Sequence, residues 1–338
     1  MWRMHELHSV LMTKAMLSLS LVSCFKHSAM IIILLGLLFI VMILNLGNLF
    51  LQPSFSEMIS YGNNGTADSN CNCVVFRMDN VQDYWVRAGQ LAAMNQFIFR
   101  NESVTVGIIM GSIGEDTEII NKIKQGSDSG LFKLATHGWN HTDFATLSEE
   151  DQRNSLDDSN RKMMELFGNA SEIFMPPFGA FNDDTINAMT QVNMKILAGN
   201  TSSFDRLELK VNNESSILSS SPVQSKNISY IPSTISFKDY YGDQYIQNSL
   251  EDIFNNATQS IGEYGYAVIE FDPEHFMEID DNGTPTDIVD QNAINELSRL
   301  IHFILSNNIR IGSFAEITAE MKNKDMIIPS SNSTSQTS

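Results

Sequence analysis

The segment Thr136-His137-Gly138-Trp139-Asn140-His141 places two histidines four residues apart, directly after a short apolar run. On one helical turn, side chains at positions i and i+4 project from the same face, so we expect both imidazoles to converge on one cation. An acidic stretch, Asp79-Asn80-Val81-Gln82-Asp83, lies earlier in the chain. A carboxylate from this stretch would complete the open three-ligand geometry of hydrolytic metal sites. The alternative is a pair of histidines whose hydrogen bonds are satisfied on a polar turn.

Short apolar runs alternate with amphipathic stretches on both sides of this segment. The runs predicted as strands are 73–78, 104–110, 132–135, 172–174, 194–198, 266–271 and 309–312. The stretches predicted as helices are 84–100, 115–125, 148–167, 182–192, 244–261, 287–305 and 314–321. Residues 201–226 are rich in Ser and Asn and predict a surface insertion. This alternation predicts a parallel sheet, either a β/α barrel or a doubly wound sheet.

Four polar or proline residues come just after predicted strands: Asp79, His137, Pro176 and Asp272. In both architectures the active residues collect at the carboxyl ends of the strands. We therefore expect these four residues to share one site.

Residues 30–51 form the most apolar part of the chain, and they are long enough to cross a hydrocarbon core as a helix. Basic residues precede this segment, and after it no Lys or Arg occurs before Arg77. This bias places residues 1–29 in the cytoplasm and the rest of the chain outside. A cleaved signal peptide is the rival interpretation, but the run is long and lacks a convincing cleavage site.

We therefore predict a single-pass protein of the cell membrane, anchored in the lipid bilayer through residues 30–51. Residues 52–72 read as a linker, 73–322 as an extracellular catalytic domain and 323–338 as a polar Ser/Thr tail. Ten Asn-x-Ser/Thr sequons agree with an exported glycoprotein. Cys71 and Cys73 are too close in sequence for an easy mutual disulfide, so we interpret them as two thiols at the start of a strand. The net charge of -19 argues against nucleic acid as a partner.

With these motifs in this order, residues 73–320 resemble the polysaccharide deacetylase (NodB-homology) family. The resemblance rests on four segments, which are Arg77-Met78-Asp79-Asn80, the histidine pair, Phe174-Met175-Pro176-Pro177-Phe178-Gly179 and Ile269-Glu270-Phe271-Asp272-Pro273-Glu274-His275.

The resemblance implies a distorted parallel β/α barrel that removes N- or O-acetyl groups from polymeric sugars with a divalent metal ion, for which we expect zinc. It implies that Asp79 is the general base and that His137 and His141 bind the metal, with Asn80 as their partner. The loop residues expected to bind the acetylated polysaccharide are Pro176, Pro177 and Phe178. Trp139 is a further substrate-binding candidate through stacking on a sugar ring, although packing is the alternative.

Three departures from the family pattern affect the expected chemistry. Asn80 stands where the family has a metal-binding aspartate, and it is a neutral, weaker ligand. Met175 stands where an arginine is common, which leaves Asp79 without its usual orienting cation. Asp272 occupies the place of the catalytic histidine, with His275 three residues later. We expect one of these last two residues to protonate the leaving group.

The sequence thus predicts a membrane-anchored, metal-dependent carbohydrate deacetylase at the cell surface. The alternative is a catalytically impaired barrel that binds surface carbohydrate without turning it over. A weaker alternative is a glycosidase that uses Asp79 with Asp272 or Glu274 as paired carboxylates. That hypothesis leaves the histidine pair without a role.

Overall fold

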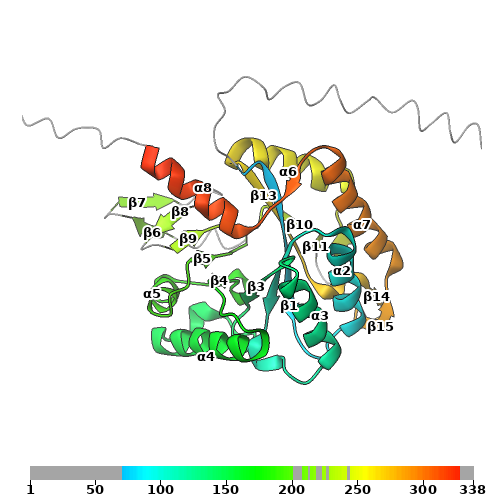
Figure 1. Cartoon of the computed structure of the whole chain (residues 1–338), viewed down its shortest axis with the longest axis horizontal. Helices are drawn as coiled ribbons and strands as arrows, with labels where there is room; N and C mark the ends of the chain where they lie inside the picture. Colours follow the sequence, from blue (N-terminus) through cyan, green and yellow to red (C-terminus); the bar gives the residue numbers. More distant parts are fainter. Residues whose placement is uncertain are drawn as a thin grey trace, which may run out of the picture. The chain divides into compact units, whose positions relative to one another are not determined.

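The central sheet of the computed structural model runs in the order β10, β13, β1, β2, β3, β4, β5, β9, β8 (Figure 1). The structure describes residues 71–200, 208–211, 214–217, 223–225, 228–241 and 244–327. The strands are β1 (Cys73–Val81), β2 (Val104–Ile108), β3 (Phe132–Thr136), β4 (Ile173–Phe174), β5 (Ile196–Leu197), β8 (Val223–Ser225), β9 (Ile228–Tyr230), β10 (Ile235–Ser236), β13 (Tyr266–Phe271) and β16 (Arg310–Ile311), which pairs with β1. Every pairing is parallel except that of β8 with β9.

Helices lie around the outside of these strands (Figure 1). They are α2 (Arg87–Arg100), α3 (Thr117–Asp128), α4 (Glu149–Phe167), α5 (Asp183–Gln191), α6 (Leu250–Tyr264), α7 (Gln291–Ser306) and α8 (Phe314–Ile327). Three antiparallel hairpins complete the described chain: β6 (Glu208–Val211) with β7 (Glu214–Ile217), β11 (Lys238–Tyr241) with β12 (Gln244–Gln247), and β14 (Met277–Ile279) with β15 (Pro285–Val289).

The parallel sheet is a half-barrel. Within the described residues β10 and β8 are the two ends of the strand order, and no ladder joins them. The predicted α/β architecture with a distorted parallel barrel is confirmed in this open form. Strands β4 and β5 are only two residues long, which loosens the sheet on the side where a closed barrel would continue.

Alternate residues of the long strands point to the inside of the half-barrel. Cys73 and Val75 of β1, together with Tyr266 and Val268 of β13, belong to one buried apolar cluster, which Phe314 of α8 joins. The intervening residues face the helices instead, as the ring of Phe76 does at 5.3 Å from that of Phe97 in α2. The same parity then places Arg77, Asp79, Glu270 and Asp272 inside the barrel, above the apolar cluster.

Several predicted helices begin too early because side-chain caps fix their first residues. The helix predicted from Gln244 begins at Leu250, since Ser249 accepts a hydrogen bond from the backbone N–H of Asp252. The helix predicted from Asp287 begins at Gln291, after the cap Asp290. Residues 244–247 and 285–289 form strands of hairpins instead.

The helix predicted from Tyr84 begins only at Arg87. Tyr84 and Val86 have φ angles of 58° and 36°, in the left-handed region that a β-branched residue rarely adopts. The buried side chain of Gln90 holds this turn, because its amide accepts from the N–H of Gln82 at 3.1 Å and donates to the carbonyl of Gln82 at 2.8 Å.

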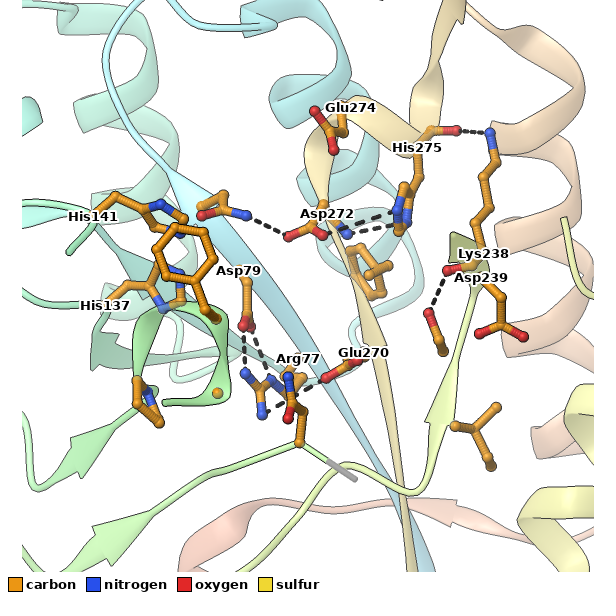
Figure 2. Close-up of a pocket in the computed structure, with 18 of the residues that line it drawn as sticks. Arg77, Asp79, His137, His141, Lys238, Asp239, Glu270, Asp272, Glu274 and His275 are labelled. Atoms are coloured by element: carbon orange, nitrogen blue, oxygen red, sulfur yellow. Dashed lines mark hydrogen bonds and ion pairs between the residues drawn. The ribbon is translucent and has the colours of Figure 1, made fainter. Parts of the chain in front are cut away.

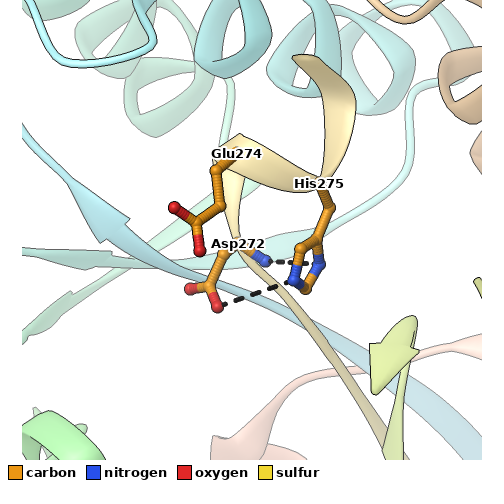
Figure 3. A group of neighbouring side chains, drawn as sticks. All are labelled: Asp272, Glu274 and His275. Carbon is orange, nitrogen blue, oxygen red and sulfur yellow. Dashed lines mark hydrogen bonds and ion pairs between the residues drawn. The ribbon is translucent and has the colours of Figure 1, made fainter. Parts of the chain in front are cut away.

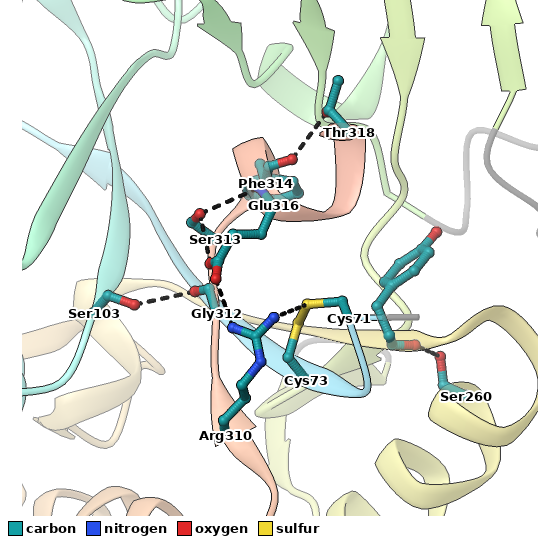
Figure 4. Close-up of a disulfide and its surroundings, with 11 residues drawn as sticks. Cys71, Cys73, Ser103, Ser260, Arg310, Gly312, Ser313, Phe314, Glu316 and Thr318 are labelled. Carbon is teal, nitrogen blue, oxygen red and sulfur yellow. Dashed lines mark hydrogen bonds and ion pairs between the residues drawn. A yellow bond between two sulfur atoms is a disulfide. The ribbon is translucent and has the colours of Figure 1, made fainter. Parts of the chain in front are cut away.

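The interpretation of Cys71 and Cys73 as free thiols is wrong, since the two residues form a disulfide (Figure 4). Asn72 between them has a φ of 43°, which folds the chain back and brings the two Cα atoms to 5.1 Å. Arg310 donates to the sulfur of Cys71 at 3.3 Å, so the disulfide ties the start of β1 to β16.

The predicted membrane segment, residues 30–51, lies outside the described residues, as do residues 1–29 and almost all of the predicted linker. Among the residues that the structure does describe, no helix combines the length and the apolarity that crossing a bilayer would need.

The packing of α3 on β3 yields a stability prediction. A Cβ on Gly126 would lie 2.2 Å from the ring of Phe132, whereas a Cβ on Gly262 of α6 would meet nothing within 4 Å. Alanine is favoured over glycine in a helix by about 1 kcal/mol. Gly262→Ala should therefore raise the free energy of unfolding by up to that amount, while Gly126→Ala should lower it by about 1–3 kcal/mol through overpacking. Urea denaturation of the two variants checks both signs.

Candidate active site

One cavity of about 920 Å³ opens at the carboxyl ends of the central strands (Figure 2). Eight residues predicted from the sequence line it: Asp79, Asn80, His137, His141, Pro176, Phe178, Asp272 and His275. They come from β1, from the loops after β3 and β4, and from the end of β13. The expectation that strand ends bring these residues together is met in the geometry of this structure.

Arg77 is the buried cation at the floor of this cavity, with 2% of its side chain exposed. Its guanidinium holds the carboxylate of Asp79 from two sides, with Nε donating to Oδ1 at 2.9 Å and an Nη group donating to Oδ2. The other Nη group donates to the carbonyls of Ala198 at 3.0 Å and Gly199 at 2.6 Å. Glu270 lies 3.9 Å away. Arg77 thus joins β1, β13 and the end of β5.

The expectation that Asp79 lacks an orienting cation is wrong. The arginine stands two residues before Asp79 on the same strand, so both side chains point into the barrel. Met175, at the position where the family commonly has arginine, packs nearby. Its sulfur lies 2.7 Å from the position that a Cβ on Gly107 would occupy, and the Cα of Asp79 lies 3.5 Å from that same position. The i, i+2 spacing of Arg77 and Asp79 was the signal in the sequence for this pair.

Asp79 and Asp272, two of the carboxyl groups that line the cavity, have opposite pKa shifts. Burial raises the pKa of Asp79, but the charge and hydrogen bonds of Arg77 outweigh burial and hold that pKa below its usual value. Burial raises the pKa of Asp272 well above its usual value, and the carboxylates of Asp79, Glu270 and Glu274 raise it further. One cavity therefore holds a carboxyl group with a lowered pKa beside one with a raised pKa, which is the division that acid–base catalysis needs.

The histidine pair converges, although not on a helix. Residues 137–141 form a loop after β3, in which Gly138 has a φ of 79°, so the predicted helical turn is wrong. The two imidazole centroids are nevertheless 5.0 Å apart. Burial lowers the pKa of His137 to about 4 and also lowers that of His141, so both rings are neutral at physiological pH.

Hydrogen bonding fixes which nitrogen of His137 faces the cavity. Its Nδ1 lies 2.8 Å from the carbonyl oxygen of Met175, and a neutral imidazole must donate there. Nε2 therefore carries the lone pair, which is the arrangement of a metal-binding histidine whose second nitrogen is held by a backbone carbonyl.

Asn80 lies between the histidine side of the cavity and Asp272. It has a φ of 60°, and its amide nitrogen donates to Oδ1 of Asp272 at 2.8 Å. The amide oxygen is then the atom of Asn80 that is left for a metal ion. The neutral, oriented donor set of His137, His141 and Asn80 fits a divalent cation with N and O ligands.

Asp272, Glu274 and His275 form a second group of potential ligands (Figure 3). Their ligand atoms all lie within 4.8 Å of one another. Among the described residues, no other three side chains drawn only from His, Cys, Asp and Glu come this close together. However, Nδ1 of His275 accepts from the backbone N–H of Asp272 at 3.2 Å, which leaves the proton of the neutral ring on Nε2. That nitrogen lies 3.9 Å from Oδ2 of Asp272. This tautomer has no lone pair for a metal, so the group fits a proton-handling pair better than a second metal site.

The loop after β4 forms one wall of the cavity. Phe178 has a φ of 58°, and its ring centroid lies 4.5 Å from that of His141, with 63% of the side chain exposed. Pro176 also lines the cavity, whereas Pro177 and Trp139 do not. Trp139 instead packs under the ammonium of Lys162, 5.3 Å from the ring centroid. Trp85, in the turn held by Gln90, is an aromatic lining residue that sequence reasoning missed.

Comparison with known protein families confirms the resemblance that the motifs indicate. The family described as polysaccharide deacetylase matches residues 101–197, which contain the histidine pair and the proline loop. No curated protein sequence matches the chain.

Solved structures share the fold at low sequence identity. A candidate polysaccharide deacetylase from Mycobacterium smegmatis is 12% identical and superposes with a TM-score of 0.54 over 78% of this chain and 94% of its own. A carbohydrate esterase family 4 pseudoenzyme from Bacillus anthracis is 13% identical, with a TM-score of 0.46 over 75% of this chain and 67% of its own. A family 4 acetyl xylan esterase from Clostridium thermocellum with a bound cobalt ion is 13% identical, with a TM-score of 0.46 over 73% and 90%. The likeness to the Mycobacterium smegmatis structure shows the fold alone.

The buried pair of Arg77 and Asp79 yields a prediction for stability and its pH dependence. Arg77→Met should lower the free energy of unfolding by about 3–5 kcal/mol at pH 7, because it leaves a buried carboxylate without its counter-charge. The lowered pKa of Asp79 contributes stability above its unfolded pKa of about 3.9, and this contribution is lost as the pH falls through the folded pKa. The difference in free energy of unfolding between the wild type and Arg77→Met should therefore become smaller below about pH 4.

Chemical denaturation at pH 7 and at pH 3 measures this difference. Arg153→Met is the control, because Arg153 is 42% exposed in a surface ion pair and should contribute less than about 1 kcal/mol. Equal losses in the two variants would contradict the role of Arg77.

Proposed function

We propose that this polysaccharide deacetylase-like protein is a metal-dependent hydrolase that removes acetyl groups from N- or O-acetylated glycans. The observation that carries the proposal is that one cavity holds two neutral histidines together with one carboxyl group of lowered pKa and one of raised pKa. Hydrolysis of an amide or ester needs an activated water, a polarised carbonyl and a proton for the leaving group. Each requirement has a candidate group in this cavity.

The metal would be held by Nε2 of His137, by His141 and by the amide oxygen of Asn80. We propose zinc, because imidazole nitrogens with one oxygen ligand suit it. When bound, a divalent ion supplies Lewis acidity toward the acetyl carbonyl and lowers the pKa of water. The protein's part is to keep both imidazoles neutral by burial and to fix the orientation of His137 through the carbonyl of Met175.

Asp79 would accept the proton of the attacking water. Arg77 keeps it ionised and holds its carboxylate in one orientation, so the base needs little rearrangement. Asp272, whose pKa burial raises, would donate a proton to the leaving amine or alcohol. His275 lies 3.9 Å from Asp272 with its N–H side, and we propose that it stabilises the carboxylate formed after that transfer.

The wall formed by Pro176 and Phe178 would hold the sugar beside the histidines, with the exposed ring of Phe178 as a stacking surface. Pro177 is buried and would shape this wall from behind. Location at the cell surface, through a membrane anchor at residues 30–51, stays a prediction from the sequence.

A second candidate function is carbohydrate binding without turnover. The observation that favours it is Asn80, because a neutral amide in place of a carboxylate removes a large electrostatic contribution to metal affinity. This alternative predicts glycan binding that a chelator does not change, together with no release of acetate.

Metal content tests the ligand assignment. The purified protein should hold about one divalent ion per chain, and the double variant His137→Ala/His141→Ala should hold almost none. His302→Ala is the control, because His302 is exposed on α7, away from the cavity. Elemental analysis of the three proteins measures the ion. Equal metal content in the double variant and the wild type would contradict the proposed site.

Asn80→Asp tests whether the site is weakened at this one ligand. A carboxylate should bind the ion at least about tenfold more tightly and raise the rate of acetate release from acetylated oligosaccharides. Asn154→Asp, on the exposed face of α4, makes the same charge change outside the cavity and should alter neither quantity. Metal titration and an acetate assay give the two readouts, and unchanged affinity in Asn80→Asp would remove Asn80 from the ligand set.

A further inference from the structure

The cavity continues past Asp272, away from the histidines. The labelled side chains in Figure 2 show Asp79 and the histidine pair on one side of Asp272 and the pair Lys238–Asp239 on the other. The far part is built from the end of β10, the start of β11 and the inner face of β13. Glu270 lies opposite Ser236 in the register of β10 and β13. We call the part lined by Glu270, Asp239, Lys238, Ser236 and Asn248 the acidic lobe.

The cavity is large enough for this lobe to hold a separate part of a ligand. Its volume of about 920 Å³ is close to the upper end of the roughly 300–1,000 Å³ of small-ligand pockets. The proposed hydrolysis uses only the groups around Asp79 and Asp272. Apart from the effect of Glu270 on the pKa of Asp272, the proposed hydrolysis does not use the charged groups of the acidic lobe or the space beside them.

The carboxylates of the lobe exceed the cations that could neutralise them. The guanidinium of Arg77 is committed to Asp79 by two hydrogen bonds and only approaches Glu270 at 3.9 Å. The ammonium of Lys238 donates to the backbone carbonyl of His275, not to a carboxylate. Asp239 accepts from the neutral amide of Asn248 at 2.9 Å. Burial raises the pKa of Glu270 more than Arg77 lowers it, as expected of an undercompensated acid.

We propose that the acidic lobe binds the ammonium group of a free amino sugar next to the acetylated residue. This inference rests on the proposed function, and it names the substrate class as a partly deacetylated polymer of amino hexoses. An ammonium near Glu270 and Asp239 supplies the missing positive charge and can donate to both carboxylates. A polymer with uronic acid or sulfate groups at that position would meet like charges instead, and the cavity would reject it.

The same charge arrangement relates to the product of the reaction. Removal of an N-acetyl group converts a neutral amide into an amine that is protonated near neutral pH. A chain that has been deacetylated once thus carries the cation that the acidic lobe attracts. The protein would act preferentially beside a deacetylated unit, which either its own earlier turnover or another deacetylation supplies.

Binding measurements test the lobe without depending on turnover. Isothermal titration calorimetry compares a fully deacetylated glucosamine hexamer with a fully acetylated N-acetylglucosamine hexamer, each with the whole protein at low salt. The wild type should bind the cationic hexamer about tenfold more tightly. In Glu270→Gln/Asp239→Asn the ratio of the two affinities should fall to about one.

The matched control is Glu278→Gln/Asp281→Asn, which makes the same charge change on the exposed β14–β15 hairpin outside the cavity and should keep the tenfold ratio. Asp239→Asn alone, which leaves Glu270 beside Arg77, should lower the ratio severalfold and keeps the test available if the double variant does not fold. A wild-type ratio near one, or equal ratios in the lobe and control variants, overturns the proposal.

An acetate assay separates this inference from the proposed function. Acetate release from the acetylated hexamer with a wild-type affinity ratio near one would overturn the acidic lobe alone. No release under any metal, together with a tenfold ratio that the lobe variant abolishes, would overturn the hydrolase and retain the cation-binding lobe.

Discussion

The ion pair between Arg77 and Asp79, buried inside the half-barrel, is the interaction on which the candidate site depends. A guanidinium with 2% exposure is stable there only because a carboxylate holds it from two sides and two backbone carbonyls take its remaining donors. These partners come from two separate strand ends, so the pair fixes the spacing of β1 and β5 at the floor of the cavity. It also keeps Asp79 ionised without any contribution from a bound ion.

Burial acts in opposite ways on the groups above this pair. It lowers the pKa of His137 and raises that of Asp272, while the adjacent guanidinium outweighs burial at Asp79 and lowers that pKa. The two carboxyl groups therefore differ in the direction of their pKa shifts. This difference follows from position relative to Arg77, because Asp79 accepts two hydrogen bonds from its guanidinium whereas Asp272 accepts one from the neutral amide of Asn80.

The arginine also shows how the chain departs from the motif pattern of the family that it resembles while keeping the architecture. The motif comparison expects an arginine at the position of Met175, on the loop after β4. The structure places a guanidinium beside Asp79 from β1 instead, and the sulfur of Met175 fills space nearby. The position of Arg77 also explains the excess negative charge of the acidic lobe. Its guanidinium lies between Asp79 and Glu270 but bonds mainly to Asp79, the nearer carboxylate.

The sequence by itself determined the alternation of strands and helices and the collection of motif residues at strand ends, because hydrophobic period and chain order are local properties. The period of two along β1 also determined that Arg77 and Asp79 lie on the same face of the strand. Only the tertiary structure decided that the histidines converge from a loop, that Asn72 allows the disulfide of Cys71 and Cys73, and which carboxyl group has a raised pKa. Those outcomes depend on backbone turns and on the distances between charges from different strands, which no single stretch of sequence specifies.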